Sequence, residues 1–435
     1  MNAANTFFVI MSAILVLFMT PGLAFFYGGL VSKKNVVNTT FSVFIITGIA
    51  ILLWIAFGYN LSFVGDFHGI IGSFHHLFLH GVNLKALMPQ THIPTGAYMM
   101  FEMMFAVITP ALFVGAVVGR MRFRFLLLFI VLWSILVYYP MAHMVWSPTG
   151  FLAKLGVLDF AGGTVVHINA GVTAFVLAVF LGRRLNYKHK IIHYNLIWVV
   201  LGATILWIGW YGFNAGSALA VNNVAMQAAL TTTVSTGTAM MTWMALDRIF
   251  HGNPTLAGVS TGTLCGLVGI TPAAGYVTVW GSFWIGLIST LFSYFFVNYI
   301  KGRIKLDDTL DAFGCHGVSG IVGSILTGVF ATSSINSVVK HNGLFYGGGM
   351  HQFLLQLGVT AFTIIFVVIM DIIIIKVLEL FVPIRVSKYM EKIGMDPLEN
   401  SESADYLVNT IDPTFIKVAR QRQQARKAHQ NSQHK

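Results

Sequence analysis

The chain has 435 residues, of which 56% are hydrophobic and only 9% are charged. Because a soluble globular protein carries about 25% charged residues, this composition excludes an ordinary soluble domain and predicts a membrane protein, in agreement with a mean hydropathy of +0.76. The net charge of +11 would suit a nucleic-acid-binding protein, but the lysines and arginines are confined to alternate loops. That distribution is typical of membrane topology, so no nucleic-acid partner is predicted.

Apolar runs of about 20 residues, the length that crosses a bilayer, predict an all-α polytopic membrane protein with eleven transmembrane helices. The first run lacks a basic leader and is too long for a signal sequence, so we expect it to be retained. Only Cys265 and Cys315 occur, both inside apolar runs, and they imply no disulfide framework. The predicted spans are 6–31, 39–64, 95–118, 125–145, 162–181, 193–213, 223–246, 255–274, 277–300, 312–331 and 352–381.

The basic residues predict the orientation of these spans. Of the 26 lysines and arginines, 22 lie in loops on the same side as the C-terminal tail. The positive-inside rule therefore places the N-terminus outside and the C-terminus in the cytoplasm of a multi-pass plasma (cell) membrane protein. We expect residues 1–382 to form the transmembrane domain and residues 383–435 to form a cytoplasmic tail. Residues 418–435 are predicted to be disordered or to lie against anionic lipid.

Two predicted spans carry a histidine, His167 in the fifth and His316 in the tenth, and each follows an aspartate and glycines. An ionisable group at membrane depth costs roughly 2.5–3.5 kcal/mol on insertion scales and is tolerated mainly along a pathway. Since the fifth and tenth spans cross in opposite directions, spans 1–5 and 6–10 are predicted to form an inverted 5+5 repeat. The eleventh span would be one long extra helix outside the repeat.

The histidine pair predicts a conduit, and two neutral imidazoles in it could share a hydrogen and titrate together. The alternative is that each ring makes a structural hydrogen bond between helices. Asp159 has two candidate roles: it caps the fifth span, or its charge favours deprotonation at the outer mouth. Asp311 is expected to cap the tenth span and contact the cytoplasmic surface. The charged runs 120–124 and 305–308 are predicted to be solvated loop faces.

Five segments resemble signatures of the ammonium transporter (Amt/Mep/Rh) family, in its bacterial Amt branch. The resemblance implies a homotrimer with one channel-like pore per subunit, nitrogen uptake by transport of ammonium or ammonia, and methylammonium as an analogue. It also implies a possible PII-type regulatory protein as partner on the cytoplasmic face, no cofactor and no enzymatic activity. The segments are Pro21–Leu30, Asp159–His167, Gly209–Ser217, Gly269–Tyr276 and Asp311–Val318.

The resemblance also implies roles for single residues. Phe105, Trp146 and Ser217 would bind the cation in an outer vestibule, where aromatic faces attract a positive charge. Phe105 and Phe213 would form a gate that leads to the histidine pair, and Asp159 would support the structure without touching substrate. The surrounding residues would be Phe101, Glu102, Tyr138, Trp210 and Thr271.

This chain departs from the family pattern at three places. Glu102 stands where the family has Gln, Gly119 precedes Arg120 where Glu-Arg is usual, and Asn400-Ser401 stand where the tail usually has His-Gly. The last difference bears on regulation through the tail.

Two other classes of protein compete with a transporter. One is a membrane ammonium sensor that signals to a cytoplasmic partner. The other is an intramembrane metalloenzyme, which lacks a His-Glu-x-x-His pattern and a third ligand here. The histidines of the outer loop are spaced too irregularly to predict a metal site: His68, His75, His76, His80 and His92.

Overall fold

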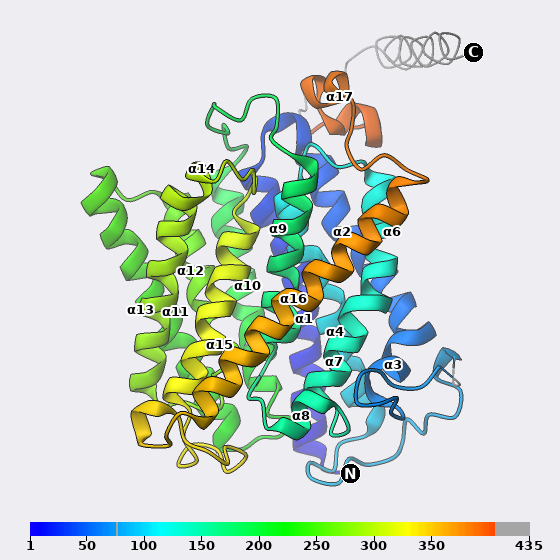
Figure 1. Cartoon of the computed structure of the whole chain (residues 1–435), viewed down its shortest axis with the longest axis vertical. Helices are drawn as coiled ribbons and strands as arrows, with labels where there is room; N and C mark the ends of the chain where they lie inside the picture. The colour runs from blue at the N-terminus through cyan, green and yellow to red at the C-terminus, as the bar shows by residue number, and fades with distance from the viewer. Residues whose placement is uncertain (75–76, 405–435) are drawn as a thin grey trace.

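The computed structural model describes residues 1–74 and 77–404, which form a bundle of helices running between two faces (Figure 1). Within these ranges no β-strand forms, and only isolated bridges, such as Met121 with Arg385, join the loops. The N-terminus and segments 64–74 and 77–94 lie at one end, here called the N-terminal face. Helix α17 (Lys388–Ile393) lies at the opposite end, here called the C-terminal face, which the basic residues predict to be cytoplasmic.

In the described part of the chain, nine helical segments are long and apolar enough to cross a membrane. These segments coincide with nine of the eleven predicted spans, and the all-α polytopic fold is confirmed. The helices of the first half are α1 (Ala3–Leu30), α2 (Val36–Leu53), α3 (Tyr59–Phe63), α4 (Thr95–Leu112), α5 (Val114–Val117), α6 (Phe123–Trp133), α7 (Tyr139–Trp146), α8 (Phe151–Leu155) and α9 (Asn169–Leu181).

The other two predicted spans coincide with helices outside that set of nine. One is α11 (Asn223–His251), which is long but carries many Thr and Ser residues, and the other is α12 (Leu256–Ile270), which is short. The remaining helices of the second half are α10 (Leu196–Gly216), α13 (Val279–Phe295), α14 (Lys301–Arg303), α15 (Ser319–Phe330) and α16 (His351–Glu379).

Several spans contain a π-helical turn, and two of these turns contain the two histidines. Segment η5 (Gly163–Ile168) contains His167 and leads into α9, and η7 (Phe313–Val318) contains His316 and leads into α15. Such turns are rare and occur frequently at functional sites. The other membrane π-turns are η2 (Trp54–Gly58), η4 (Ser134–Tyr138) and η6 (Phe296–Ile300).

The two halves pack through glycines. The most extensive helix pair is α1 with α10, the first helix of each predicted half, and α9 packs against η7 while α15 packs against η5. Figure 1 shows α9 and α15 running in opposite directions, as an inverted repeat requires. A Cβ added at Gly171 would lie 2.2 Å from the Gly317 nitrogen. Only glycine permits this approach, so the two histidine-bearing helices pack closely here.

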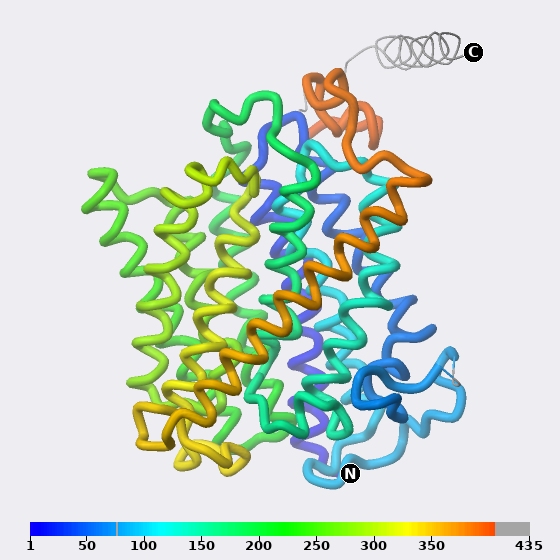
Figure 2. Tube along the Cα trace, in the orientation of Figure 1, coloured from blue at the N-terminus to red at the C-terminus, as the bar shows by residue number. Residues whose placement is uncertain are grey.

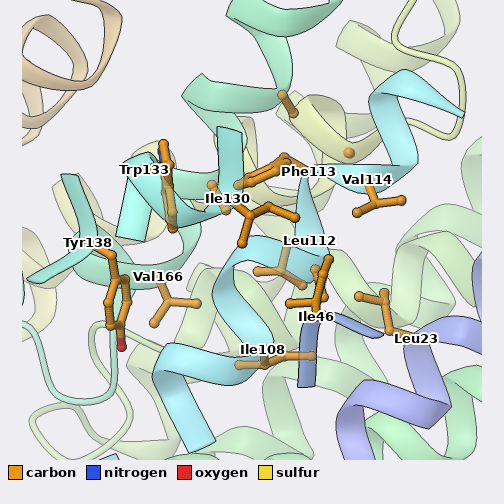
Figure 3. Close-up of a cluster of buried hydrophobic side chains, with 14 of the residues drawn as sticks. Leu23, Ile46, Ile108, Leu112, Phe113, Val114, Ile130, Trp133, Tyr138 and Val166 are labelled. Carbon is orange, nitrogen blue, oxygen red and sulfur yellow. The ribbon is translucent and has the colours of Figure 1, made fainter. Parts of the chain in front are cut away.

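Apolar side chains from α1, α2, α4, α5, α6 and η5 meet in the core of the first half (Figure 3). Because lipid is as apolar as these side chains, dispersion contacts between closely fitted surfaces hold the helices together here. The residues labelled there are Leu23, Ile46, Ile108, Leu112, Phe113, Val114, Ile130, Trp133, Tyr138 and Val166. Helix α16, the long extra span, crosses the outside of the bundle obliquely (Figure 2) and contacts α6, α9 and α15.

The chain beyond α16 packs on the C-terminal face as far as it is described. Asp396, in the π-turn η9 (Asp396–Asn400), accepts the N–H groups of Val37 (3.0 Å) and Asn38 (2.9 Å) at the start of α2. The Asn38 amide also donates to Asn400 Oδ1 at 2.8 Å. Asn400, one of the tail residues that differ from the family pattern, therefore contacts the start of α2. The predicted disorder of residues 418–435 lies outside the described residues, as do His75 and His76.

Candidate functional site

A cavity of about 250 Å³ lies at the end of the bundle where α7 and α10 terminate. It brings together Phe105 from α4, Trp146 from α7 and Ser217 at the end of α10, as the sequence predicts. The wall combines aromatic rings with two carboxyl groups, a chemistry that attracts a small cation. The complete lining, here called the vestibule, is Tyr98, Glu102, Phe105, Val145, Trp146, Val157, Asp159, Phe160, Ser217, Leu219 and Tyr276.

Local contacts hold the vestibule side chains in place. Trp146 Nε1 donates to the Asp159 carbonyl at 3.2 Å, and the Trp146 ring meets the Phe105 ring edge-on, with centroids 5.7 Å apart. The Ser217 hydroxyl donates to the Phe213 carbonyl at 2.8 Å. Since this bond uses the only hydrogen of the hydroxyl, its oxygen can still accept from a donor in the vestibule.

The vestibule ends at two buried phenylalanines. The rings of Phe105 and Phe213 are tilted by 34° with centroids 4.2 Å apart, and their side chains are 1% and 0% exposed. Phe101 packs edge-on against Phe105 at 5.0 Å between centroids. The structure therefore places the two predicted gate rings in direct contact with each other, and Phe105 also lines the vestibule.

A row of rings continues from the gate into the bundle. The His167 ring lies 5.8 Å from Phe213, 5.3 Å from Trp210 and 5.4 Å from His316, measured between centroids. Its plane is nearly parallel to those of Trp210 and His316, at 14° and 12°. Trp210 is fixed in turn, because its Nε1 donates to Thr271 Oγ1 at 2.8 Å.

The ring nitrogens of the histidine pair have free hydrogen-bonding capacity. Both nitrogens of His167, and Nδ1 of His316, are buried without a partner among the described residues. The predicted shared hydrogen is therefore not formed in this structure, since neither nitrogen of His167 has a hydrogen-bond partner although the two rings are nearly parallel. A buried polar group without a partner costs about 1–3 kcal/mol, so its presence here indicates a site that meets polar molecules.

Asp159 holds the turn that presents His167. Its carboxylate accepts the N–H groups of Gly162 (2.9 Å), Gly163 (2.5 Å), Thr164 (3.0 Å) and Val165 (3.2 Å), and also the Thr164 hydroxyl. The predicted capping contacts are thus present. Because Asp159 also lines the vestibule, its second predicted role, assistance to deprotonation, stays a prediction.

The corresponding cap in the second half is Asp308, and the predicted capping role of Asp311 is wrong. The Asp308 carboxylate accepts the N–H groups of Ala312 (3.0 Å), Phe313 (2.8 Å) and Gly314 (3.2 Å). Asp311 adopts a left-handed backbone conformation with φ of 59°, which turns its side chain to pair with Lys301. Asp308 precedes His316 by the same interval that separates Asp159 from His167, so the repeat is more regular than the sequence motif indicates.

The charged runs 120–124 and 305–308 are not simply solvated, contrary to prediction. Arg120, Asp307 and Asp308 are 1%, 2% and 1% exposed. Arg120 Nη1 lies 3.2 Å from the Asp307 carboxylate, and burial of both groups is possible because each neutralises the other.

The two remaining predicted residues, Glu102 and Tyr138, lie in different surroundings. Glu102 lines the vestibule, where its carboxyl group interacts with the Tyr98 side chain. Tyr138 is not part of the cavity wall; it stacks on Trp133 at 6.1 Å in the core shown in Figure 3.

The sequence reasoning missed three aromatic residues of the vestibule. They are Tyr98, Phe160 and Tyr276, and the rings of the last two meet edge-on with centroids 5.2 Å apart. The sequence held a signal for two of them, because Phe160 follows Asp159 directly and Tyr276 is the last residue of the family-like segment Gly269–Tyr276.

Fold and site together define a class: a polytopic membrane protein in which an aromatic, carboxylate-bearing mouth adjoins two tilted phenylalanine rings and, next to them, a buried histidine pair. The model of the Ammonium Transporter Family matches residues 7–405. The chain belongs to this family.

Individual relatives agree in length and fold. The ammonium transporter of Bacillus subtilis (strain 168) is 43% identical over 404 residues, which cover 93% of this chain and 99% of that protein. The ammonium transporter of Aquifex aeolicus (strain VF5) is 44% identical over 405 residues, covering 93% and 94%. Among solved structures, Saccharomyces cerevisiae Mep2 superposes with a TM-score of 0.81 at 30% identity, covering 89% and 88%. A protein described as a sensor Amt protein superposes with a TM-score of 0.83 at 27% identity, covering 91% and 98%.

The family and the helices settle the general function and location. The chain transports ammonium, is not an enzyme, and is a multi-pass protein of the plasma membrane.

Proposed function

We propose that this protein binds the ammonium cation in the vestibule, releases one of its protons to the solvent water on that side, and conducts the remaining ammonia inward. The single observation that carries the proposal is the continuous row from Phe105 and Phe213 to His167 and His316, closed by stacked rings and ending in unpartnered imidazole nitrogens. Phe105, Trp146 and Ser217 receive the cation, through two ring faces and one acceptor oxygen.

The physical reason for deprotonation is the cost of moving charge into the bundle. An idealised Born estimate for a monovalent ion entering a medium of low dielectric constant is of order 20 kcal/mol. Ammonia is neutral and avoids this cost, whereas potassium, which matches ammonium in charge and approximate size, has no proton to lose. Ammonia can also donate to or accept from the free nitrogens of the histidine pair. The same geometry therefore supports both conduction and selectivity.

The proposal is tested by uptake into liposomes that contain the purified protein. We expect saturable uptake of radiolabelled methylammonium above that of empty liposomes, and competition by unlabelled ammonium. The competing function is ammonium sensing, which the structural similarity to a sensor Amt protein raises. A protein that binds ammonium but gives no uptake above empty liposomes would contradict the transport mechanism and favour the sensor.

We further propose the assembly that the family resemblance implies: a homotrimer with one pore in each subunit, a transmembrane domain of residues 1–382, and a cytoplasmic tail of residues 383–435. The row of rings lies within a single chain, which supports one pore per subunit. Asp396 and Asn400 bind the start of α2, which holds the first part of the tail on the C-terminal face. A PII-type protein that docks on this face would therefore contact the tail.

Native mass spectrometry tests this assembly. We expect a species of three chains and, after addition of the host's PII protein, a heavier species in which one PII trimer is bound, because three-fold partners match symmetrically. A monomer or dimer would contradict the trimer. A trimer that binds no PII protein under any nucleotide condition would remove that partner.

A further inference from the structure

A second cavity, of about 470 Å³, lies on the C-terminal face and shares no residue with the vestibule. Its wall is assembled from segments far apart in the sequence, which come together beside α17. We call it the basic cavity. It is lined by residues 31–32 and 34–35 after α1, residues 118–120 after α5, residues 184–186 and 189–192 after α9, Thr309, and Glu391 and Lys392 of α17.

Positive charge dominates this lining. It contains five lysines and arginines but only one carboxylate, Glu391. That carboxylate is already engaged, since it binds Arg385 at 2.7 Å and accepts the Leu185 N–H at 2.5 Å. The five cationic residues are Lys34, Arg120, Arg184, Lys190 and Lys392.

The carboxylate behind the wall does not neutralise this excess. Asp307 lies between two arginines, 3.2 Å from Arg120 and 2.7 Å from Arg184, so one negative charge serves two positive ones. The Lys34 ammonium donates to the carbonyl oxygens of Glu391 (2.7 Å) and Lys392 (2.8 Å), which carry no full charge. Within the part of the chain that the structure describes, the Lys190 and Lys392 side chains form no ion pair.

Arg120 is a buried cation in the wall of the basic cavity, unlike a cluster of charges on an exposed surface. Its side chain is 1% exposed, yet its Nε has no hydrogen-bond partner among the described residues. Burial lowers the pKa of the Arg120 guanidinium to about 10, while the Asp307 carboxylate acts in the opposite direction. A buried cation with an unsatisfied N–H group is stabilised by an additional anion, and guanidinium groups suit phosphate geometry.

We propose that the basic cavity binds a phosphate group carried by a small organic molecule. Lys34, Arg184, Lys190 and Lys392 surround the phosphate, and Arg120 supplies charge from behind. The volume is within the range of small-molecule sites, and Val31, Val118, Leu185, Ile191 and Ile192 give the organic part an apolar wall. Because the wall includes both the loop after α9 and α17, the bound ligand ties the start of the tail to that loop.

The test uses the full-length protein in nanodiscs of zwitterionic lipid, with inorganic pyrophosphate as the soluble probe and phosphatidylglycerol as the lipid probe. The variant is Lys190→Gln with Lys392→Gln, two exposed side chains that hold no other charge in place. The matched control is Arg303→Gln with Lys305→Gln, two exposed cations after α13 that do not line the cavity.

We expect saturable pyrophosphate binding that weakens with salt and that falls about tenfold or more in the cavity variant, because charge-assisted contacts are lost. The control variant should bind within about twofold of the unaltered protein. Binding of phosphatidylglycerol alone, lost in the cavity variant, would support the site and identify a lipid headgroup as its source. Absence of binding for both probes, or equal loss in cavity and control variants, would overturn the proposal. Neither result depends on transport.

Discussion

Replacing His167 or His316 with alanine is expected to abolish selective ammonium flux while the protein still folds and assembles. Each change removes one of the two rings that we propose line the conduit beyond the contacting rings of Phe105 and Phe213. We expect the ratio of ammonium to potassium flux in liposomes to fall at least about tenfold, which corresponds to a loss of about 1.4 kcal/mol in discrimination. Folding should change little, because the deleted nitrogens of His167 form no hydrogen bond with the described residues.

A third histidine provides the matched control. His143 is fully buried like the pair, but its Nδ1 and Nε2 lie 3.0 Å from the Ser62 carbonyl and 3.0 Å from the Asp66 carboxylate. His143→Ala should therefore lower thermal stability and leave the ratio of fluxes unchanged. If both His167→Ala and His316→Ala conduct ammonium with unaltered selectivity, the conduit role of the pair is wrong.

The second large effect is expected from the aspartates that cap the two histidine-bearing turns. Asp159→Ala leaves four backbone N–H groups and the Thr164 hydroxyl without their acceptor. At about 1–3 kcal/mol for each unsatisfied buried donor, the destabilisation amounts to several kcal/mol. Asp308→Ala removes the acceptor of three N–H groups and should be damaging in the same way. The yield of folded protein and its thermal midpoint, followed by fluorescence-detected gel filtration, measure both effects.

Asp311→Ala is the control for this pair of variants. Its carboxylate is partly exposed and, among the described residues, caps no helix and pairs with the Lys301 ammonium alone. Exposed ion pairs contribute about 0–1 kcal/mol, so we expect a small shift in the thermal midpoint. A larger loss for Asp311→Ala than for Asp308→Ala would restore Asp311 as the cap and refute the assignment made from the structure.

Several features of the fold and the site could be predicted from the sequence. Nine of the eleven predicted spans follow from apolar length alone, because a helix must satisfy its own backbone in lipid. The histidine pair stood out for the same reason, since an ionisable side chain in an apolar run needs an explanation. The gate residues Phe105 and Phe213 needed the family resemblance, because their rings are two among many in a chain that is 14% aromatic.

Other features depended on geometry that no local pattern encodes. Three aspartates stand within residues 307–311, and the backbone conformation of Asp311 decides that Asp308 is the cap. Arg120 looked solvated because its partner Asp307 comes from the opposite half of the chain. The π-turns at both histidines, and the unpartnered nitrogens of His167, likewise follow no local sequence pattern. The contact of Tyr138 with Trp133, beside its π-turn, is set by packing.

The central claim is that the cation loses its proton before it passes the gate, and a comparison of ammonium with potassium tests it most directly. Liposomes containing the purified protein would receive equal inward gradients of labelled ammonium and of a potassium tracer, with empty liposomes as reference. We expect ammonium flux well above the reference, weaker methylammonium flux, and potassium flux equal to that of empty liposomes. Potassium flux that rises with the amount of protein and parallels the ammonium flux would contradict the account.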